Sequence, residues 1–333
     1  MIEKTEEAIM ANWSTKEIPL VSIRCITYNH EKYIADALDS FLMQETNFPF
    51  EIIIHDDASK DKTASIISEY QKAYPHIVKP IFEQENQYSK GNGIIDHIIA
   101  EHIKGKYVAV CEGDDYWTDE SKLQRQFEAM ERHPEVDICA HTVRRVSAKS
   151  GKVLGTISPK KKDEIIPADQ VIAGGGGFVG TNSLFYREQL FEKAQPFRKQ
   201  LNIDYTLQVQ GALRGGMLFL SRCMSDYRVM TEGSWSARSA NEDVANEIDA
   251  RWDKMTEQLD VDTNGIYHDV IQRYMERGKV NQLLQFEHYD ELKKYKSTYK
   301  KMEGDDKRRY FIKLHFPRTY VAVKKIWNRV RNG

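Results

Sequence analysis

Three acidic residues lie within a span of four at the end of an apolar run: Glu112, Asp114 and Asp115. The preceding residues 107–111 read Tyr-Val-Ala-Val-Cys and predict a buried strand. Clustered carboxylates repel one another unless a cation lies between them. Hard oxygen ligands beside a strand end suit Mg²⁺ or Mn²⁺, which keep waters and often share a substrate phosphate. The plain alternative is a solvated acidic loop, because charge runs usually face water.

A second acidic pair, Asp56 and Asp57, follows the apolar run 50–55. Helix capping explains the polar residues just after this pair, since hydroxyls and acids stabilise a helix N-terminus. Capping does not explain two acids at the strand end itself. A carboxylate placed there can accept the imide N–H of uracil or thymine, so we interpret the pair as a candidate for base recognition.

The first apolar run, 20–26, ends in Thr27, Tyr28 and Asn29. A tyrosine at the end of a central strand could stack on a nucleobase. The alternative is a tyrosine that packs against the following helix.

Alternating strand-like and helix-like segments must position these residues. Such alternation predicts an α/β fold with a mostly parallel sheet and helices on both faces. Ligands of such sheets bind beyond the carboxyl ends of the strands, where all three polar segments fall. The expected strands are 20–26, 50–55, 78–82, 107–111 and 136–143, and the expected helices are 33–43, 62–74, 94–103 and 122–133.

The pattern loosens after residue 143. We expect a hairpin over 146–157, strands at 183–186 and 217–221, a helix at 204–213, and a helical, polar chain from about residue 240. Four glycines at 174–177 do not follow the first strand, so they are no dinucleotide fingerprint. They predict either a loop near an acceptor or a plain connection.

Together the three polar blocks resemble the signature of family 2 glycosyltransferases with the GT-A fold, over about residues 19 to 235. The resemblance implies a GT-A, Rossmann-like domain at 19–238, after an N-terminal extension at 1–18. A helical C-terminal region, 239–333, would follow it. The resemblance also implies a nucleoside-diphosphate sugar donor, with a UDP-sugar favoured, a Mn²⁺ or Mg²⁺ cofactor, and inversion at the anomeric carbon.

The same resemblance implies roles for individual residues of the nucleotide site. Tyr28, with Thr27 and Asn29 beside it, would contact the nucleobase, and Asp57 would read the base. Asp114 would contact ribose or metal, and Asp115 would bind the divalent cation. The family often carries an arginine near the nucleotide after the third strand, and the nearest cation here is Lys90.

Roles for three further residues follow from the resemblance. Asp204 would be the catalytic base, because an inverting transfer needs a carboxylate to take the acceptor proton while a metal balances the leaving diphosphate. A helix N-cap is the alternative reading of Asp204. Arg228 and Trp235 would cover the diphosphate, or else pack a terminal strand. Many members carry a histidine where this chain has Met230.

Composition narrows the class of protein. The 333 residues carry a net charge of −2, which argues against a nucleic-acid binder. Four cysteines without metal-ligand spacing indicate reduced thiols and a cytoplasmic protein. The charged N-terminus lacks the apolar core of a signal peptide, and no apolar run is long enough to predict a transmembrane helix.

Residues 307–333 contain nine lysines and arginines and no acid. The apolar side chains Val323, Ile326, Trp327 and Val330 fall on one helical face of this segment. A basic amphipathic helix can lie on anionic lipid at the inner face of a cell membrane. The alternative is a helix docked on the protein with a solvated basic face.

We therefore expect a glycosyltransferase that acts on a hydroxyl of a glycan or lipid-linked acceptor in surface polysaccharide biosynthesis. One alternative is a non-catalytic nucleotide-sugar-binding partner in an assembly complex. Another is a sugar nucleotidyltransferase, although no glycine-rich basic loop follows the first strand.

Overall fold

The computed structural model describes residues 4–15, 18–90, 93–229, 242–296 and 304–332. The chain divides into two compact units, residues 1–234 and 235–333. The expected domain end at residue 238 falls within 230–241, outside the described residues, and it stays a prediction. In the described ranges, every helix is too short or too polar to cross a bilayer.

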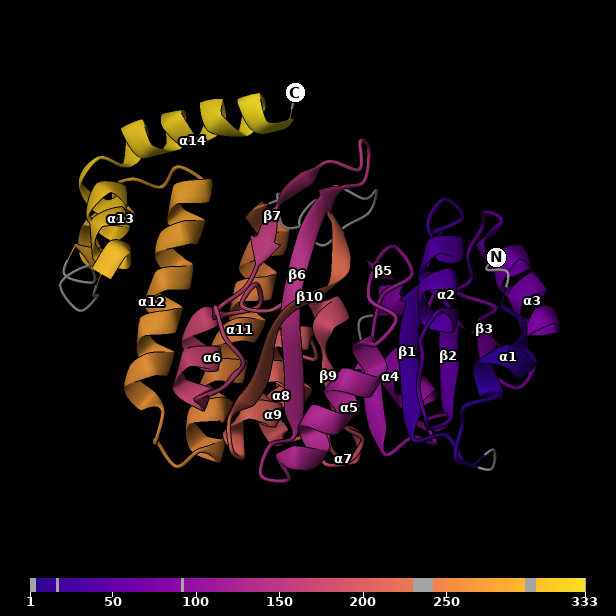
Figure 1. The fold of residues 1–333 in the computed structure, drawn as a ribbon. Helices are drawn as coiled ribbons and strands as arrows, with labels where there is room; N and C mark the ends of the chain where they lie inside the picture. The colour runs from indigo at the N-terminus through magenta and orange to yellow at the C-terminus, as the bar shows by residue number, and fades with distance from the viewer. Residues whose placement is uncertain (1–3, 16–17, 91–92, 230–241, 297–303, 333) are drawn as a thin grey trace. The chain divides into compact units, whose positions relative to one another are not determined.

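The strands of the first unit form one sheet of ten, counted over the described residues (Figure 1). The order along the sheet is β3-β2-β1-β4-β9-β6-β10-β5, with β7 paired to β6 and β8 paired to β10. The strands are β1 Val21–Thr27, β2 Phe50–Asp56, β3 Val78–Phe82, β4 Tyr107–Val110, β5 Tyr116–Trp117, β6 Ile138–Ser147, β7 Val153–Ile157, β8 Glu164–Ile166, β9 Phe185–Arg187 and β10 Met217–Val229.

Strand direction confirms the mostly parallel sheet for its main strands. β3, β2, β1 and β4 are parallel neighbours, and so are β6 and β10. The short β9 is antiparallel to both β4 and β6, so these two sets run in the same direction. The hairpin expected around residues 149–151 is the antiparallel β6–β7 pair.

Helices cover both faces of this sheet. One core cluster joins α2 Ile34–Leu42, α3 Thr63–Ala73 and α5 Lys122–Arg132 to one face of β1 and β2. A smaller cluster joins α4 Ile94–Ala100 to the other face. The remaining helices of this unit are α1 Glu6–Met10, α6 Ala168–Gly174, α7 Gln189–Glu192, α8 Pro196–Gln200 and α9 Asp204–Leu213, with the 3₁₀ turns η1 Tyr88–Lys90 and η2 Thr181–Ser183.

The expected N-terminal extension packs on the same unit. Ile9 of α1 is buried in the core cluster that contains β1 and β2. The Glu6 carboxylate accepts backbone hydrogen bonds from His76 and Ile77 at 2.7 and 3.0 Å. Part of this segment therefore belongs to the core of the domain.

The second unit is helical, as expected. It contains α11 Glu242–Asp262, α12 His268–Gln285, η3 Glu291–Tyr295, α13 Gly304–His315 and α14 Pro317–Asn332. Its buried cluster includes Leu283, Leu292, Tyr310 and Leu314.

Lys122 is a buried lysine without a carboxylate partner among the described residues. It is 0% exposed, its Nζ lies 3.8 Å from the ring centroid of Trp117, and it donates to Oε1 of Gln126 at 2.8 Å. Burial lowers the pKa of Lys122 to about 7. Because this pKa lies below the ordinary lysine value, the folded state binds fewer protons than the unfolded state from about pH 7 upward. The free energy of unfolding should therefore rise with pH through that range.

Replacing Lys122 with methionine should raise the free energy of unfolding by about 2 kcal/mol near pH 7 and flatten its pH dependence. Methionine keeps the apolar stem and removes the unpaired ammonium. Urea unfolding of both proteins at pH values below and above 7 measures the effect. Lys152→Met, at an exposed position, is the matched control. A Lys122→Met variant that is less stable than the wild type at both pH values would contradict this assignment.

Candidate active site

Three loops meet at the carboxyl ends of β2, β1 and β4, which are neighbours in the sheet. The Asp57 N–H donates to the carbonyl of Thr27 at 3.0 Å, and the Gly113 N–H donates to the carbonyl of Ile26 at 2.9 Å. A Cβ at Gly113 would lie 2.7 Å from Oγ1 of Thr27, so only glycine permits this approach. The structure thus brings the three predicted polar blocks together.

The ends of the first two blocks are tied by Asn29. Its backbone has a φ of 56°, a left-handed conformation that asparagine tolerates. Its side-chain oxygen accepts from the N–H of Lys60 at 2.8 Å, and its own N–H donates to Oγ of Ser59 at 2.9 Å. Tyr28 beside it is 43% exposed, so its ring is open to a planar ligand.

Asp57 is buried at 1% exposure and holds the loop after β3. One carboxylate oxygen accepts from the N–H of Gln87 at 2.6 Å, and the other accepts from the N–H of Tyr88 at 3.0 Å. Each carboxylate oxygen has a second lone pair, so these bonds leave acceptor capacity for a base. Lys90, at the end of the same loop, is half-exposed and pairs with Glu85 at 2.6 Å.

The acid cluster begins where β4 ends. Asp115 is 1% exposed, and its Oδ1 accepts from the N–H of Arg228 at 2.7 Å. Burial, and then the negative charge of Asp114, raise the pKa of Asp115 well above its usual range. Burial also raises the pKa of Glu112 to about 7, with the charges of Asp204 and Asp114 adding to the effect against that of Arg24.

These carboxylates fit a divalent cation that takes few protein ligands. In the part of the chain that the structure describes, no group of three or more His, Cys, Asp or Glu side chains is arranged to enclose a metal. Mg²⁺ and Mn²⁺ commonly use one or two carboxylates and complete their shell with water and substrate phosphate. A cation would also relieve the unfavourable burial of charged Asp115.

Arg228 lies beside this cluster with its guanidinium engaged. Nη1 donates to the carbonyl of Asp114 at 2.9 Å, and Nη2 pairs with Asp36. The guanidinium also lies 4.3 Å from the ring centroid of Tyr116 and 5.1 Å from that of Tyr33. In the structure these contacts fix the acid cluster against β10. Trp235 and Met230 lie outside the described residues.

Asp204 is the first residue of α9, as predicted. Its Oδ2 accepts from Oγ1 of Thr181 at 2.5 Å. Burial raises the pKa of Asp204, although the Thr181 hydrogen bond acts against the shift. Arg24, which pairs with Glu112 at 3.4 Å and with Asp96 at 2.5 Å, links the acid cluster to Asn202, two residues before Asp204.

The four-glycine run lies next to this helix. Gly174 is the last residue of α6, and Gly175 has a φ of 73°, which favours glycine. A Cβ at Gly176 would lie 3.8 Å from the Cβ of Tyr205, the second residue of α9. The glycine run therefore lies beside the start of α9, and its role as a loop near an acceptor stays a prediction.

Four residues near this site were not predicted from the sequence. Arg24 and Asp96 form an ion pair at 2.5 Å, and Asn202 donates to the same Asp96. Tyr227 precedes Arg228, and burial raises its pKa to about 12 with the charges of Asp115 and Asp114 adding to the shift. Only Arg24 gave a signal in the sequence, as a lone cation in an apolar strand.

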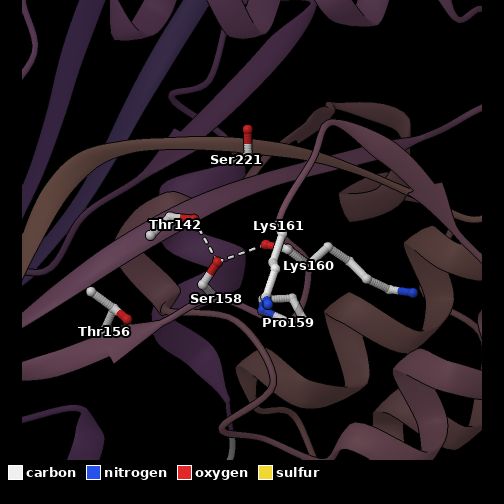
Figure 2. A pocket seen from close by; sticks show the side chains of 7 residues that line it. All are labelled: Thr142, Thr156, Ser158, Pro159, Lys160, Lys161 and Ser221. Carbon is white, nitrogen blue, oxygen red and sulfur yellow. Dashed lines mark hydrogen bonds between the residues drawn. The ribbon is translucent and has the colours of Figure 1, made fainter.

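A separate cavity of about 610 Å³ lies over β6, β7 and β10 (Figure 2). The hydroxyl of Ser158 is 2.8 Å from Oγ1 of Thr142 and donates to the carbonyl of Lys160, also at 2.8 Å. None of the predicted site residues lines it; the lining residues are Thr142, Thr156, Ser158, Pro159, Lys160, Lys161 and Ser221.

The family model described as glycosyl transferase family 2 matches residues 22–193, just over half of the chain. The chain belongs to glycosyltransferase family 2. The matched range contains the three polar blocks and ends before Asp204, so the family assignment does not depend on the proposed base.

The chain is also similar to individual bacterial proteins. A protein of Mycobacterium tuberculosis, named as uncharacterized, is 40% identical over 215 residues, covering 65% of this chain and 60% of that protein. TuaG of Bacillus subtilis, named as a teichuronic acid biosynthesis glycosyltransferase, is 36% identical over 121 residues, covering 36% of this chain and 44% of that protein. The match thus spans about three fifths of the length of the mycobacterial protein.

Solved structures share the fold. TarS residues 1–349 of S. aureus, in complex with UDP, superposes with a TM-score of 0.59 at 16% identity, covering 93% of this chain and 91% of that one. The mannosyltransferase PcManGT of Pyrobaculum calidifontis, in complex with GDP-Man and Mn²⁺, has a TM-score of 0.52 at 14% identity, covering 94% and 88%. This likeness confirms the expected GT-A fold class.

Proposed function

We propose that the protein transfers a sugar, with inversion, from a UDP-sugar to a hydroxyl of a glycan or lipid-linked acceptor. The observation that carries the proposal is that Arg24, Asp96 and Asn202 join the acid cluster after β4 to the start of α9, where a second kind of carboxylate lies. Asp114 and Asp115 lie in the loop after β4, and Asp204 begins α9 with a raised pKa. Asp114 and Asp115 suit the binding of a cation and a diphosphate, and Asp204 suits the role of a general base.

The proposed roles are those that the resemblance to the family implies for each group. Tyr28 stacks on the base, beside Thr27 and Asn29, and Asp57 accepts its imide N–H. Asp114 binds the ribose, and Asp115 holds Mn²⁺ or Mg²⁺, which balances charge on the diphosphate. Asp204 takes the proton from the acceptor hydroxyl. Similar folds solved in complex with UDP, with UDP-GlcNAc, and with GDP-Man and Mn²⁺ support a nucleotide-sugar donor.

Donor consumption tests this proposal against its alternatives. The protein should release UDP slowly from one UDP-sugar without an added acceptor, in the presence of Mn²⁺. Consumption of a sugar 1-phosphate with a nucleoside triphosphate would instead indicate a nucleotidyltransferase. Tight UDP-sugar binding without any turnover, with or without a glycan acceptor, would indicate a non-catalytic binder.

We place the reaction in surface polysaccharide assembly, at an anionic membrane surface. The similarity to TuaG, which is named for teichuronic acid biosynthesis, supports the role in polysaccharide assembly. Charge supports the placement at a membrane surface, because residues 307–333 contain nine lysines and arginines and no acid. On α14, Val323 and Ile326 are 60% and 61% exposed. Apolar side chains flanked by lysines are the pattern of a helix that lies in a lipid interface.

Replacing Val323 and Ile326 together with asparagine should lower co-sedimentation with phosphatidylglycerol vesicles about tenfold, because two apolar side chains no longer enter the interface. A deletion of the segment is less informative, since Tyr310 and Leu314 are buried in the cluster of the second unit. In the matched control, asparagine replaces Val261 and Ile266, which are 68% and 76% exposed in the same unit. Equal sedimentation of the two double variants would rule out contact through α14.

A further inference from the structure

Arg24 occupies an unusual place in the middle of β1. Its neighbours Ile23 and Cys25 are 0% exposed, and its own side chain is 11% exposed. Burying a guanidinium is unfavourable unless charged partners surround it. Central strands of parallel sheets normally carry valine, isoleucine or leucine at such positions. The fold itself therefore does not require an arginine here.

Two carboxylates from different elements meet the Arg24 guanidinium. Nη2 lies 2.5 Å from Oδ1 of Asp96, in the first turn of α4, and Nη1 lies 3.4 Å from Oε1 of Glu112. Strand register explains the second contact, because Arg24 pairs with Val110 and Glu112 lies two residues further along. Although burial opposes the shift, the guanidinium holds the pKa of Asp96 below its usual range.

The second oxygen of Asp96 continues this set of contacts to α9. Oδ2 of Asp96 accepts a hydrogen bond from the side-chain amide of Asn202. Asn202 lies two residues before Asp204, the first residue of α9. Polar contacts thus run without a break from Glu112 through Arg24 and Asp96 to the start of the helix that carries the proposed base.

We propose that Arg24 is a positioning residue that fixes the first turn of α9, and with it the Asp204 carboxylate, against the acid cluster at the end of β4. The inference rests on the proposed function, because the base role of Asp204 is part of it. Proton transfer requires the base within hydrogen-bond reach of the acceptor, and a displacement of about 1 Å can lower a rate about 100-fold. The contacts of Arg24 reach α9 through Asp96 and Asn202.

Two variants cut these contacts at different points. Asn202→Ala removes the last link at an exposed residue, where the substitution spares the core. Arg24→Met removes the guanidinium and keeps a long side chain. Asn281→Ala is the matched control, since Asn281 is an exposed asparagine that accepts one hydrogen bond, from Lys313 at 2.8 Å, in the second unit.

Amide hydrogen exchange over residues 203–210 gives a readout that does not depend on activity. Both variants should raise exchange there about tenfold, and the control should leave it unchanged. For UDP-GlcNAc hydrolysis with Mn²⁺, kcat should fall about tenfold while KM stays within about twofold. Arg24→Lys, which keeps a cation opposite Asp96, should restore part of kcat. The Arg24→Met, Asn202→Ala double variant should match the stronger single variant, because both cut one set of contacts.

Unchanged exchange over 203–210 in both Asn202→Ala and a folded Arg24→Met would overturn the proposal. A loss of kcat without a change in exchange would also overturn it, because Asn202 would then contact the substrate directly. If the wild type hydrolyses no UDP-GlcNAc, the proposed function fails for that donor. Hydrogen exchange would still decide whether Arg24 positions α9.

Discussion

Replacing Asp115 with asparagine should lower donor turnover at least ~1,000-fold, because a cation at the diphosphate contributes several kcal/mol of transition-state stabilisation. Asparagine can still accept the hydrogen bond from the Arg228 N–H, which Oδ1 of Asp115 accepts at 2.7 Å. The expected loss is therefore of cation binding and not of the local fold. UDP release from a UDP-sugar, measured against Mn²⁺ concentration, checks the prediction.

Stability separates this loss from unfolding. The pKa of Asp115 is raised in the folded protein, so at neutral pH the ionised carboxylate opposes folding. A neutral asparagine removes this effect, and the melting temperature without cation should be equal to or above that of the wild type. Asp163→Asn, at an exposed acid outside the cluster, is the control. Undiminished turnover in Asp115→Asn would show that the cation binds to a residue other than Asp115.

Replacing Asp204 with asparagine should lower turnover about 100- to 10,000-fold and leave UDP affinity unchanged, because it removes general-base catalysis without touching the nucleotide. The amide oxygen can still accept the hydrogen bond that Thr181 donates at 2.5 Å. Steady-state kinetics and UDP titration calorimetry on the same preparation measure both quantities. Retained turnover would assign the base to another residue.

The wild-type pH profile gives an independent view of Asp204. Burial raises its pKa, so its proton leaves at a higher pH than that of an ordinary aspartate. As pH falls through this raised value, the base becomes protonated and the rate should decline. The decline should therefore begin above the usual aspartate range. A profile flat down to about pH 4, the ordinary aspartate value, would contradict the assignment.

Sequence periodicity predicted the elements that hold the site. The helix expected at 204–213 is α9 with the same bounds, and the strand expected at 78–82 is β3. Long, strongly apolar or amphipathic segments carry enough residues to reveal their period. The two- and three-residue strands β5 and β8 are too short for any pattern to emerge.

Features that residue periodicity did not predict depend on contacts between segments far apart in the sequence. The predicted strand 217–221 continues as β10 to Val229, past register shifts against β6 where its alternation breaks. The convergence of the three polar blocks could be predicted, because each block follows a parallel strand and the carboxyl ends of parallel strands lie at one edge of the sheet. The link from Arg24 through Asp96 to Asn202 joins segments far apart in sequence, and no local spacing encodes it.

A cation-dependent nucleotide-sugar site at Asp115 is central to the proposed function. Its most direct test is the thermal shift of wild type and Asp115→Ala with UDP-, GDP- and dTDP-sugars, with and without Mn²⁺. We predict a rise in melting temperature with a UDP-sugar that requires Mn²⁺ and disappears in the variant. No rise with any donor, or an equal rise in both proteins, would contradict the claim.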